Sequence, residues 1–218
     1  MILKIMLLLL FLIFLSAQDT PDKLTDELTV LPFTDEAALD SAFYEFRERL
    51  IQAVIERDTS YVLSVFHPEV KLDFGGGYGI EELRRRLSDP DWYTDLWTAL
   101  HSVLSLGGTF SGSTHFIAPY VYSMWPNEYD AFNYLAITED DVPVYKKPDT
   151  TACIVTHLSY TIVEYDYSWY NNVWVKIYVP PDKTGYVKRT VTRGPIDYRV
   201  FFVKTDSEWK ITIFLAGD

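Results

Sequence analysis

The strongest constraint in the sequence is a change of hydrophobic period at Gly107 and Gly108. Before these glycines, apolar residues recur every three or four positions, as they do on the buried face of an amphipathic helix. The longest such pattern predicts a helix with Thr34 as its N-cap and Arg57 near its end. Further helices are predicted over residues 60–66, 80–87 and 92–104. After the glycines, short runs of Val, Ile, Tyr and Thr alternate with turn residues, which predicts strands.

The predicted strands are distributed unevenly along the chain. A single half-buried strand, residues 70–74, lies among the helices, and extended structure is expected over residues 109–122, overlapping an aromatic connector at 118–132. The chain ends in a predicted hairpin of strands 198–204 and 209–215. A helix and one strand cannot bury a core by themselves, so more sheet must pack on them. The predicted fold class is therefore α+β.

The beginning of the chain has the features of an export signal. Residues 5–15 form an uninterrupted apolar run behind Lys4. The run is shorter than the roughly 20 residues needed to cross a bilayer, and no basic stop-transfer flank follows it. We predict a signal peptide over residues 1–17, cleaved after Ala17, and a loose leader over residues 18–33. The protein is then expected to be secreted or periplasmic, without a membrane span after cleavage; an uncleaved anchor is the alternative.

Charge and cysteine content restrict the partners and the source of stability. The chain has 19 Lys and Arg against 31 Asp and Glu, a formal net charge of −12. Nucleic acids and anionic membrane surfaces are bound by clustered Lys and Arg, so neither is an expected partner. The single cysteine, Cys153, allows no internal disulfide, and its strand-like neighbours predict a buried, inert thiol. Stability must therefore come from packing.

The segments VPVYKKPDTTACIVTHLSY and WVKIYVPPDKTGYV carry anchor residues in a recognisable order. They resemble the bacterial SH3-like (SH3b) family, whose pattern is roughly V-N-V-R-x-x-P, then W-x-x-V and G-x-x-G-[WY]-V. The matching residues are Val142, Val144, Pro148, Trp174, Val175, Ile177, Gly185, Tyr186 and Val187. The sequence departs from the pattern at Pro143, where Asn is usual, and at Tyr145, where Arg is usual. The resemblance implies a small SH3-like β-barrel over residues 131–194.

The remaining elements, from the long helix to the terminal EWKITIFLAGD, resemble the cone-shaped NTF2-like (cystatin-like) fold. This resemblance implies an NTF2-like domain over residues 34–130 plus 195–218, whose sheet the terminal hairpin completes and which the barrel interrupts. Such a cone usually encloses an apolar pocket. The residues expected near the mouth of the pocket are Asp73, Tyr78, Trp92, Trp97, His101 and His115. Core packing is the favoured role for the two tryptophans.

Signatures of catalysis are weak. None of the four histidines has a second His or Cys at metal-ligand spacing, and the H-E-x-x-H, C-x-x-C and G-x-S-x-G motifs are missing from the sequence. We therefore predict no metal site and no cofactor. If the pocket were enzymatic, Asp73 or His101 would be its base, but no paired group is in view. Enzymatic activity is left open, and the sequence favours a protein that binds without catalysis.

The run DFGGGYGIEEL, residues 73–83, raises the question of a phosphate cradle. Glycine loops that open a helix can bind anions through free backbone N–H groups. This run lacks the Lys and Ser or Thr that follow the last glycine of a P-loop, and Glu81 and Glu82 would repel an anion from the helix start. We expect a sharp turn into the helix instead, with Tyr78 at the lip of a pocket.

Residues 160–178 hold more aromatic rings than a small barrel needs. Because successive strand residues point to opposite faces, some rings are expected to face solvent. The predicted ligand-binding residues of the barrel are Tyr145, Tyr165, Tyr167, Trp169 and Tyr170. Exposed Tyr and Trp suit stacking on sugars or gripping a peptide, so the expected partner is a cell-wall peptide or glycan, or an envelope protein. Packing of these rings against the first domain, and a small-molecule pocket in that domain, are the alternatives.

Overall fold

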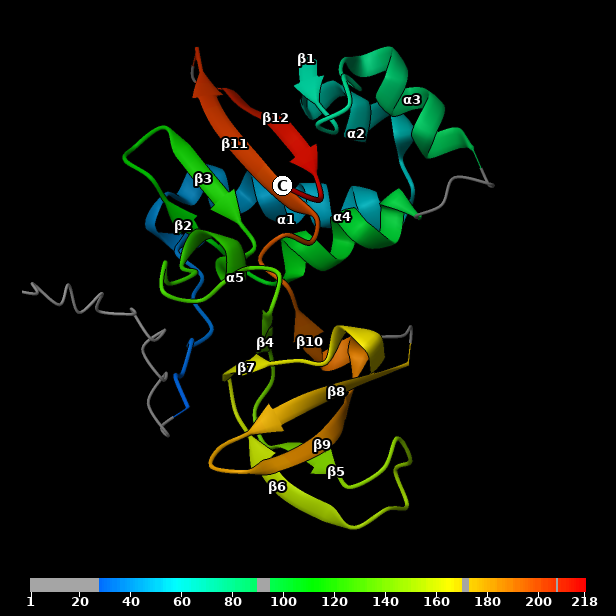
Figure 1. Ribbon diagram of the computed structural model, residues 1–218. Helices are drawn as coiled ribbons and strands as arrows, with labels where there is room; N and C mark the ends of the chain where they lie inside the picture. The colour runs from blue at the N-terminus through cyan, green and yellow to red at the C-terminus, as the bar shows by residue number, and fades with distance from the viewer. Residues whose placement is uncertain (1–27, 90–94, 170–172, 207) are drawn as a thin grey trace, which may run out of the picture.

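The computed structural model describes residues 28–89, 95–169, 173–206 and 208–218 (Figure 1). The predicted signal peptide and the first part of the predicted leader lie outside the described residues. Helices and open sheets are combined in the chain, so the α+β class is confirmed. Across the described ranges, no helix is both long enough and apolar enough to span a membrane.

A five-stranded sheet takes its strands from both ends of the chain. Its order is β1 (Phe66–Lys71), β12 (Glu208–Leu215), β11 (Arg199–Thr205), β3 (His115–Ala118) and β2 (Thr109–Phe110). β1 is parallel to β12, and the other neighbouring strands are antiparallel. The predicted terminal hairpin is thus confirmed as β11 and β12. It occupies the middle of the sheet, so the sheet cannot form without the end of the chain.

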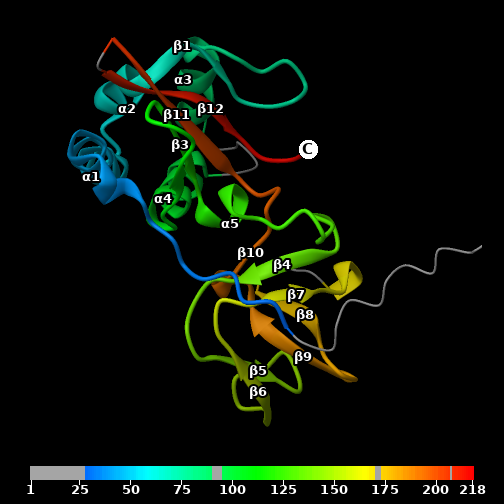
Figure 2. The same ribbon diagram turned by 90° about the vertical axis from the view of Figure 1, so that its left-hand side faces the viewer.

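Four helices contribute to the core of this sheet. They are α1 (Ser41–Ile55), α2 (Thr59–Val65), α3 (Ile80–Ser88) and α4 (Leu96–Ser105), and a short 3-10 turn, η1 (Ala37–Leu39), precedes α1. Figure 2 shows α1 and the C-terminal end of the chain on opposite sides of β11 and β12. The helices therefore leave one face of the sheet without a helical layer of its own, apart from the short α5 (Tyr120–Ser123) near its end.

The residues between β3 and β11 in the sequence form two smaller sheets, which lie below the five-stranded sheet in Figure 1. One has the order β10 (Thr192–Arg193), β4 (Tyr134–Ile137) and β7 (Ile162–Glu164). The other has the order β6 (Ile154–Leu158), β5 (Val142–Tyr145), β9 (Lys183–Lys188) and β8 (Trp174–Val179), with η2 (Tyr167–Trp169) before β8 and η3 (Arg189–Val191) after β9. They share a buried aliphatic cluster that includes Val144, Val175 and Ile177. The predicted domain boundaries stay a prediction.

The core of the larger sheet is centred on Phe43 of α1. Its ring lies 4.3 Å from the ring of Phe116 in β3, 5.2 Å from that of Phe202 in β11 and 4.7 Å from that of Trp209 in β12, measured between centroids. Most of these contacts are tilted or edge-to-face, the geometries that aromatic pairs prefer. Phe43 is completely buried. The space between α1 and the sheet is therefore filled with rings.

The segment of residues 28–36, which we call the N-terminal strap, contacts both groups of strands. Near one end, the Leu31 N–H donates to the Tyr160 carbonyl at 2.6 Å, next to β7. Near the other end, the Gly108 N–H donates to the Thr34 carbonyl at 3.0 Å, next to β2. The expectation of a loose leader up to residue 33 is therefore wrong for its described part, because backbone hydrogen bonds hold it in place.

The long helix begins later than its sequence pattern predicts. α1 starts at Ser41, and its N-cap is Asp40, whose carboxylate accepts hydrogen bonds from two backbone N–H groups of the first turn at 2.9 and 3.0 Å. Thr34 lies in the N-terminal strap and caps no helix. Asp35, expected in the first turn, instead accepts two hydrogen bonds from the buried Arg47 at 2.6 and 2.7 Å. A tertiary ion pair thus replaces the predicted local cap.

Three further predictions are corrected by the structure. The first strand runs over Phe66–Lys71 rather than residues 70–74, and Pro68 is tolerated there because β1 is an edge strand. Part of the expected extended segment is helical, as α5. The thiol of Cys153 is exposed, because this residue ends a turn before β6 and does not belong to the strand.

We predict that Phe43→Ala destabilises the protein by about 3–5 kcal/mol, because it empties the centre of the ring cluster. The measurement is urea-induced unfolding followed by circular dichroism. Tyr44→Ala, at the next position of α1, is the matched control, since its ring is 43% exposed and its loss should cost about 1 kcal/mol or less. Equal losses for the two variants would contradict the proposed centre of the core.

Candidate functional site

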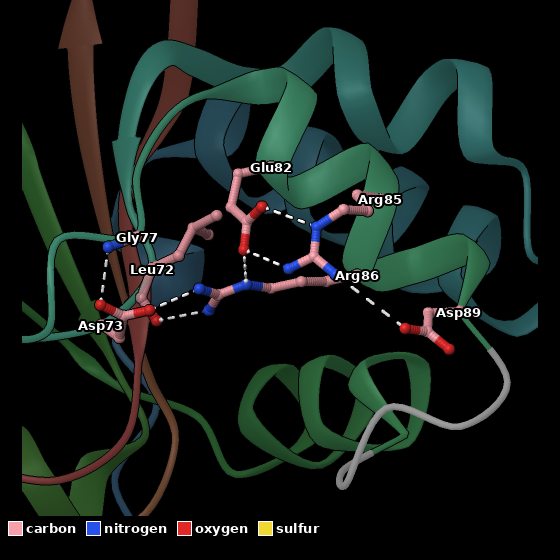
Figure 3. A network of polar contacts seen from close by, with 7 residues as sticks. All are labelled: Leu72, Asp73, Gly77, Glu82, Arg85, Arg86 and Asp89. Carbon is pink, nitrogen blue, oxygen red and sulfur yellow. Dashed lines mark hydrogen bonds and ion pairs between the residues drawn. The ribbon is translucent and has the colours of Figure 1, made fainter.

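The glycine-rich run between β1 and α3 is organised by Arg86, which projects from α3 toward the loop (Figure 3). Its side chain is 7% exposed, and its guanidinium binds the Asp73 carboxylate, the Glu82 carboxylate at 2.6 Å and the Leu72 carbonyl at 3.3 Å. The other oxygen of Asp73 accepts the Gly77 N–H at 2.7 Å. These contacts fasten the start of the loop to α3 and join it to Gly77 near the end of the loop.

Gly77 is a glycine because this network passes through the place of its side chain. A Cβ at position 77 would collide with the Asp73 carboxylate and with the Arg86 guanidinium. Its N–H is already bonded to Asp73. This donor is therefore taken by a side chain of the protein itself, and the loop is a turn fastened by an ion pair rather than a phosphate cradle.

The two carboxylates of the network are held in their ionised form. Hydrogen bonds from Arg85 and Arg86 lower the pKa of Glu82 to about 2. The Arg86 hydrogen bond, followed by the Gly77 N–H, lowers the pKa of Asp73. A carboxylate with a lowered pKa is a poor base at neutral pH. Asp73 therefore has a structural role here and does not fit the role of a catalytic base.

The other residues predicted at the pocket mouth do not gather around Asp73. Tyr78 is exposed on the loop, His101 is exposed on α4, and His115 is exposed at the start of β3, where its Nδ1 lies 3.0 Å from the Thr114 hydroxyl. Within the described ranges, no hydrogen bond or ion pair joins Asp73 or Tyr78 to either histidine.

The two tryptophans predicted near the pocket mouth, Trp92 and Trp97, do not form a site with these residues in the described structure either. Trp97 is buried in the core, as favoured from its helical spacing, and its indole N–H donates to the Leu87 carbonyl at 3.3 Å. Trp92 lies outside the described residues. The predicted pocket residues therefore do not form a common site in the described structure.

A concentration of rings lies on the outer side of β8, β9 and β5. Cross-strand register places Tyr145 beside Tyr186 and Tyr186 beside Lys176. The Trp174 and Tyr145 rings meet edge to face at 5.7 Å, and the Lys188 ammonium lies 4.0 Å from the centre of the Trp174 ring. We call this surface the aromatic face; it consists of Tyr145, Trp174, Lys176, Tyr178, Tyr186 and Lys188.

The opposite side of the same strands is the core of the smaller sheets. Val175, Ile177 and Val187 are fully buried there, and strand alternation directs their neighbours to the aromatic face. Tyr178 is 38% exposed, whereas Trp174 is buried beneath Tyr145 and the Lys188 side chain. The rings of the aromatic face thus cover a core that aliphatic side chains already fill.

Lys176 brings an ion pair to the aromatic face. Its ammonium lies 3.0 Å from the Asp166 carboxylate, and this hydrogen bond raises the pKa of Lys176. The nearby hydroxyls of Tyr178 and Tyr186 act in the same direction. The ammonium also lies 5.9 Å from the centre of the Tyr178 ring. Lys176 is therefore charged at any physiological pH and lies between the Asp166 carboxylate and the Tyr178 ring.

The structure separates the ligand-binding residues that were predicted together. Tyr145 lies on the aromatic face. Tyr165 forms a bridge with Ile177, so its side chain shares the core side of β8 and packs partly against the buried cluster. Tyr167 follows in η2 and is 78% exposed, with its ring 6.4 Å from that of Tyr165. The predicted aromatic loop is therefore a second location, distinct from the aromatic face.

The rest of the predicted aromatic loop cannot be placed on either surface. The side chain of Trp169 and the whole of Tyr170 lie outside the described residues.

The two lysines of the aromatic face were not predicted at all. Their signal was the alternation in WVKIYV, which places Trp174, Lys176 and Tyr178 on one side of a strand.

Metal binding finds no support in the described part of the chain, where no three His, Cys, Asp or Glu side chains are grouped so as to hold an ion. Comparisons with known protein families, with curated proteins and with solved structures find no match for this chain. Function is therefore inferred from the sequence and the geometry.

We predict that Gly77→Ala destabilises the protein by about 1–3 kcal/mol, because the new methyl group collides with the Asp73 carboxylate and the Arg86 guanidinium and weakens one of the two ion pairs of the buried Arg86. Thermal and urea unfolding measure the loss. Gly75→Ala is the matched control in the same loop, since its Cβ would meet only an Asp73 oxygen at an ordinary 3.5 Å. A Gly77→Ala protein as stable as Gly75→Ala would show that the network is dispensable.

We predict that Glu82→Gln weakens the acid dependence of stability. The pKa of Glu82 falls from an ordinary 4.5 to about 2 in the folded protein, so its contribution is complete above pH 4.5 and disappears as the pH falls toward 2. The variant should lose about 1–2 kcal/mol at pH 7, after allowance for solvent screening, and match the parent near pH 2. Urea unfolding at several pH values measures this difference. Glu81→Gln, which removes an exposed ion pair of 3.5 Å, should change little at any pH.

Proposed function

We propose that this protein is an exported, non-enzymatic binding protein of the bacterial cell envelope. In this proposal an SH3-like barrel over residues 131–194 binds a peptide or glycan of the wall. An NTF2-like domain, residues 34–130 plus 195–218, supports the barrel. The observation that carries the proposal is the aromatic face, where four rings and two ammonium groups lie together on the outer side of a sheet.

Packing accounts for the buried ring of Trp174 but not for the more exposed rings of the aromatic face. The core side of the same strands is filled by valine and isoleucine, and the rings stand on the other side. Tyr and Trp offer a large contact area with few rotatable bonds to freeze, which suits the binding of an extended ligand. Tyr145, Tyr186 and Lys176 lie side by side across β5, β9 and β8, and Trp174 lies beside Lys188. These neighbouring side chains could bind successive units of an extended ligand.

Lys188 favours a ligand with a carboxylate. In a chain with a formal net charge of −12, Lys188 places a positive charge over the Trp174 ring, whereas the charge of Lys176 is paired with Asp166. Wall peptides end in free carboxylates, whereas neutral glycan strands would use the rings only. A cell-wall peptide is therefore the favoured ligand, and a glycan is the other outcome to be tested. Secretion follows from the predicted signal peptide over residues 1–17.

The test is sedimentation of the chain from residue 18 onward with purified peptidoglycan. We expect binding that Tyr178→Ala and Lys188→Gln each weaken about three- to tenfold, because each removes one ring or one charge from the aromatic face. Tyr167→Ala measures separately whether the predicted loop contributes. Competition by soluble wall peptides or by glycan fragments identifies the part of the wall that is bound.

Tyr44→Ala is the control for loss of an exposed tyrosine elsewhere, and it should bind as the parent does. Circular dichroism establishes that each variant is folded. The proposal fails if the parent protein stays entirely in the supernatant, or if the aromatic-face variants sediment as well as Tyr44→Ala.

A further inference from the structure

The side of the five-stranded sheet that faces away from α1 carries a row of apolar side chains. Cross-strand register aligns one residue from each strand on this side, in the order Lys71, Ile213, Phe201, Ile117 and Thr109. The three central members are half-buried, whereas Val200 and Phe202, which point to the helices, are completely buried. We call Ile213, Phe201 and Ile117 the apolar row.

Arg199 lies at one end of the apolar row. It precedes Phe201 by two positions in β11, so both side chains point to the same side of the sheet. Arg199 is only 5% exposed. Its Nη2 donates to the Gly217 carbonyl at 2.7 Å, but its Nη1 is shielded from solvent and has no hydrogen-bond partner in the described structure. A buried guanidinium donor without an acceptor is costly, so its presence requires an explanation.

Two rings form the surroundings of this guanidinium. The guanidinium carbon lies 4.8 Å from the centre of the Tyr122 ring and 5.8 Å from that of Phe74. The Tyr122 ring also contacts Phe201 edge to face at 5.5 Å, which joins Arg199 to the apolar row. Phe74 is 51% exposed and is followed by Gly75 and its two neighbouring glycines, so its ring can be displaced with the loss of few contacts.

The charges around Arg199 favour a single anionic group. Burial lowers the pKa of Arg199, but a guanidinium is still protonated at neutral pH. The Lys71 ammonium lies 4.3 Å from the centre of the Phe74 ring and adds a second positive charge near Arg199. The Tyr122 hydroxyl and the Asp218 carboxylate act in the opposite sense, because both lie close enough to stabilise the charged form of Arg199.

We propose that Arg199 and the apolar row form a second ligand site, which binds a small amphipathic monocarboxylate. The carboxylate takes one hydrogen from Nη1 and the free hydrogen of Nη2, the paired arrangement in which a guanidinium binds a carboxylate end-on. The Phe74 ring moves aside to admit it. The apolar part of the ligand lies along Phe201, Ile117 and Ile213. This site is separate from the aromatic face and does not depend on it.

The probe is octanoate, below its micelle concentration, added to the ¹⁵N-labelled chain from residue 18 onward and followed by NMR. We expect saturable shifts of the Phe201, Ile213 and Gly217 amide resonances. Octan-1-ol has the chain without the charge, and acetate has the charge without the chain. Each should bind at least about tenfold more weakly, because it lacks one half of the recognition. Equal binding of octanol and octanoate would overturn the role of Arg199.

Variants locate the carboxylate. Arg199→Gln should weaken octanoate about tenfold or more, whereas Asp218→Asn should strengthen it several-fold by removing a competing charge. Arg57→Gln is the control for nonspecific attraction of octanoate to an arginine, since Arg57 is exposed and pairs with Asp95 at 3.3 Å. This variant should bind octanoate with the affinity of the parent. An unchanged affinity in both Arg199→Gln and Asp218→Asn would refute the site.

Two further variants keep the test decisive. If Arg199→Gln does not fold, Phe74→Ala takes its place, because removing the movable cover from a half-exposed position should raise the affinity for octanoate and acetate. Weaker or equal binding by Phe74→Ala would contradict the proposed entry. Tyr178→Ala, on the aromatic face, should bind octanoate as the parent does, so failure of peptidoglycan binding and failure of this site can be told apart.

Discussion

Aromatic packing around Phe43 is the interaction on which the larger sheet depends. This one ring joins α1 near the start of the chain to β3 in the middle and to β11 and β12 at the end. The single cysteine allows no disulfide to bring these distant segments together, so burial of apolar surface must do so. The residues of the smaller sheets lie between segments that meet in this core. Formation of the five-stranded sheet is therefore tied to the return of the C-terminal hairpin.

Periodicity in the sequence was sufficient to predict the fold class, most helices and the terminal hairpin, because each of these follows from a local pattern. It was not sufficient where a distant contact decides. The Thr34-Asp35-Glu36 run has the features of a helix cap, yet Asp35 binds Arg47 and the helix begins at Ser41. β1 begins four residues before its predicted start, since Phe66 pairs with Ile211, more than a hundred positions later. No local signal contains that information.

The candidate sites were predictable to a similar extent. Ring density marked residues 160–178 as unusual, but the side on which each ring lies depends on pairing. Tyr165 turns to the core because it bridges Ile177, and Tyr145 joins Trp174 and Tyr186 because β5 pairs with β9. The turn role of the glycine run was predicted from its missing phosphate-binding residues. Its physical cause was not, because the Arg86 network requires a contact between the loop and the side of α3.

Cations placed on aromatic rings are common to both proposed surfaces. Lys188 lies over Trp174 on the aromatic face, and Arg199 lies over Tyr122 beside the apolar row. An ammonium or guanidinium against a ring face is attracted by the ring quadrupole and is less accessible to counter-ions than one extended into water. In an acidic protein, most of the surface repels anions. Its ring-bound cations are therefore the places where a ligand can combine charge pairing with apolar contact, and the sequence supplies both requirements through its aromatic content rather than through basic clusters.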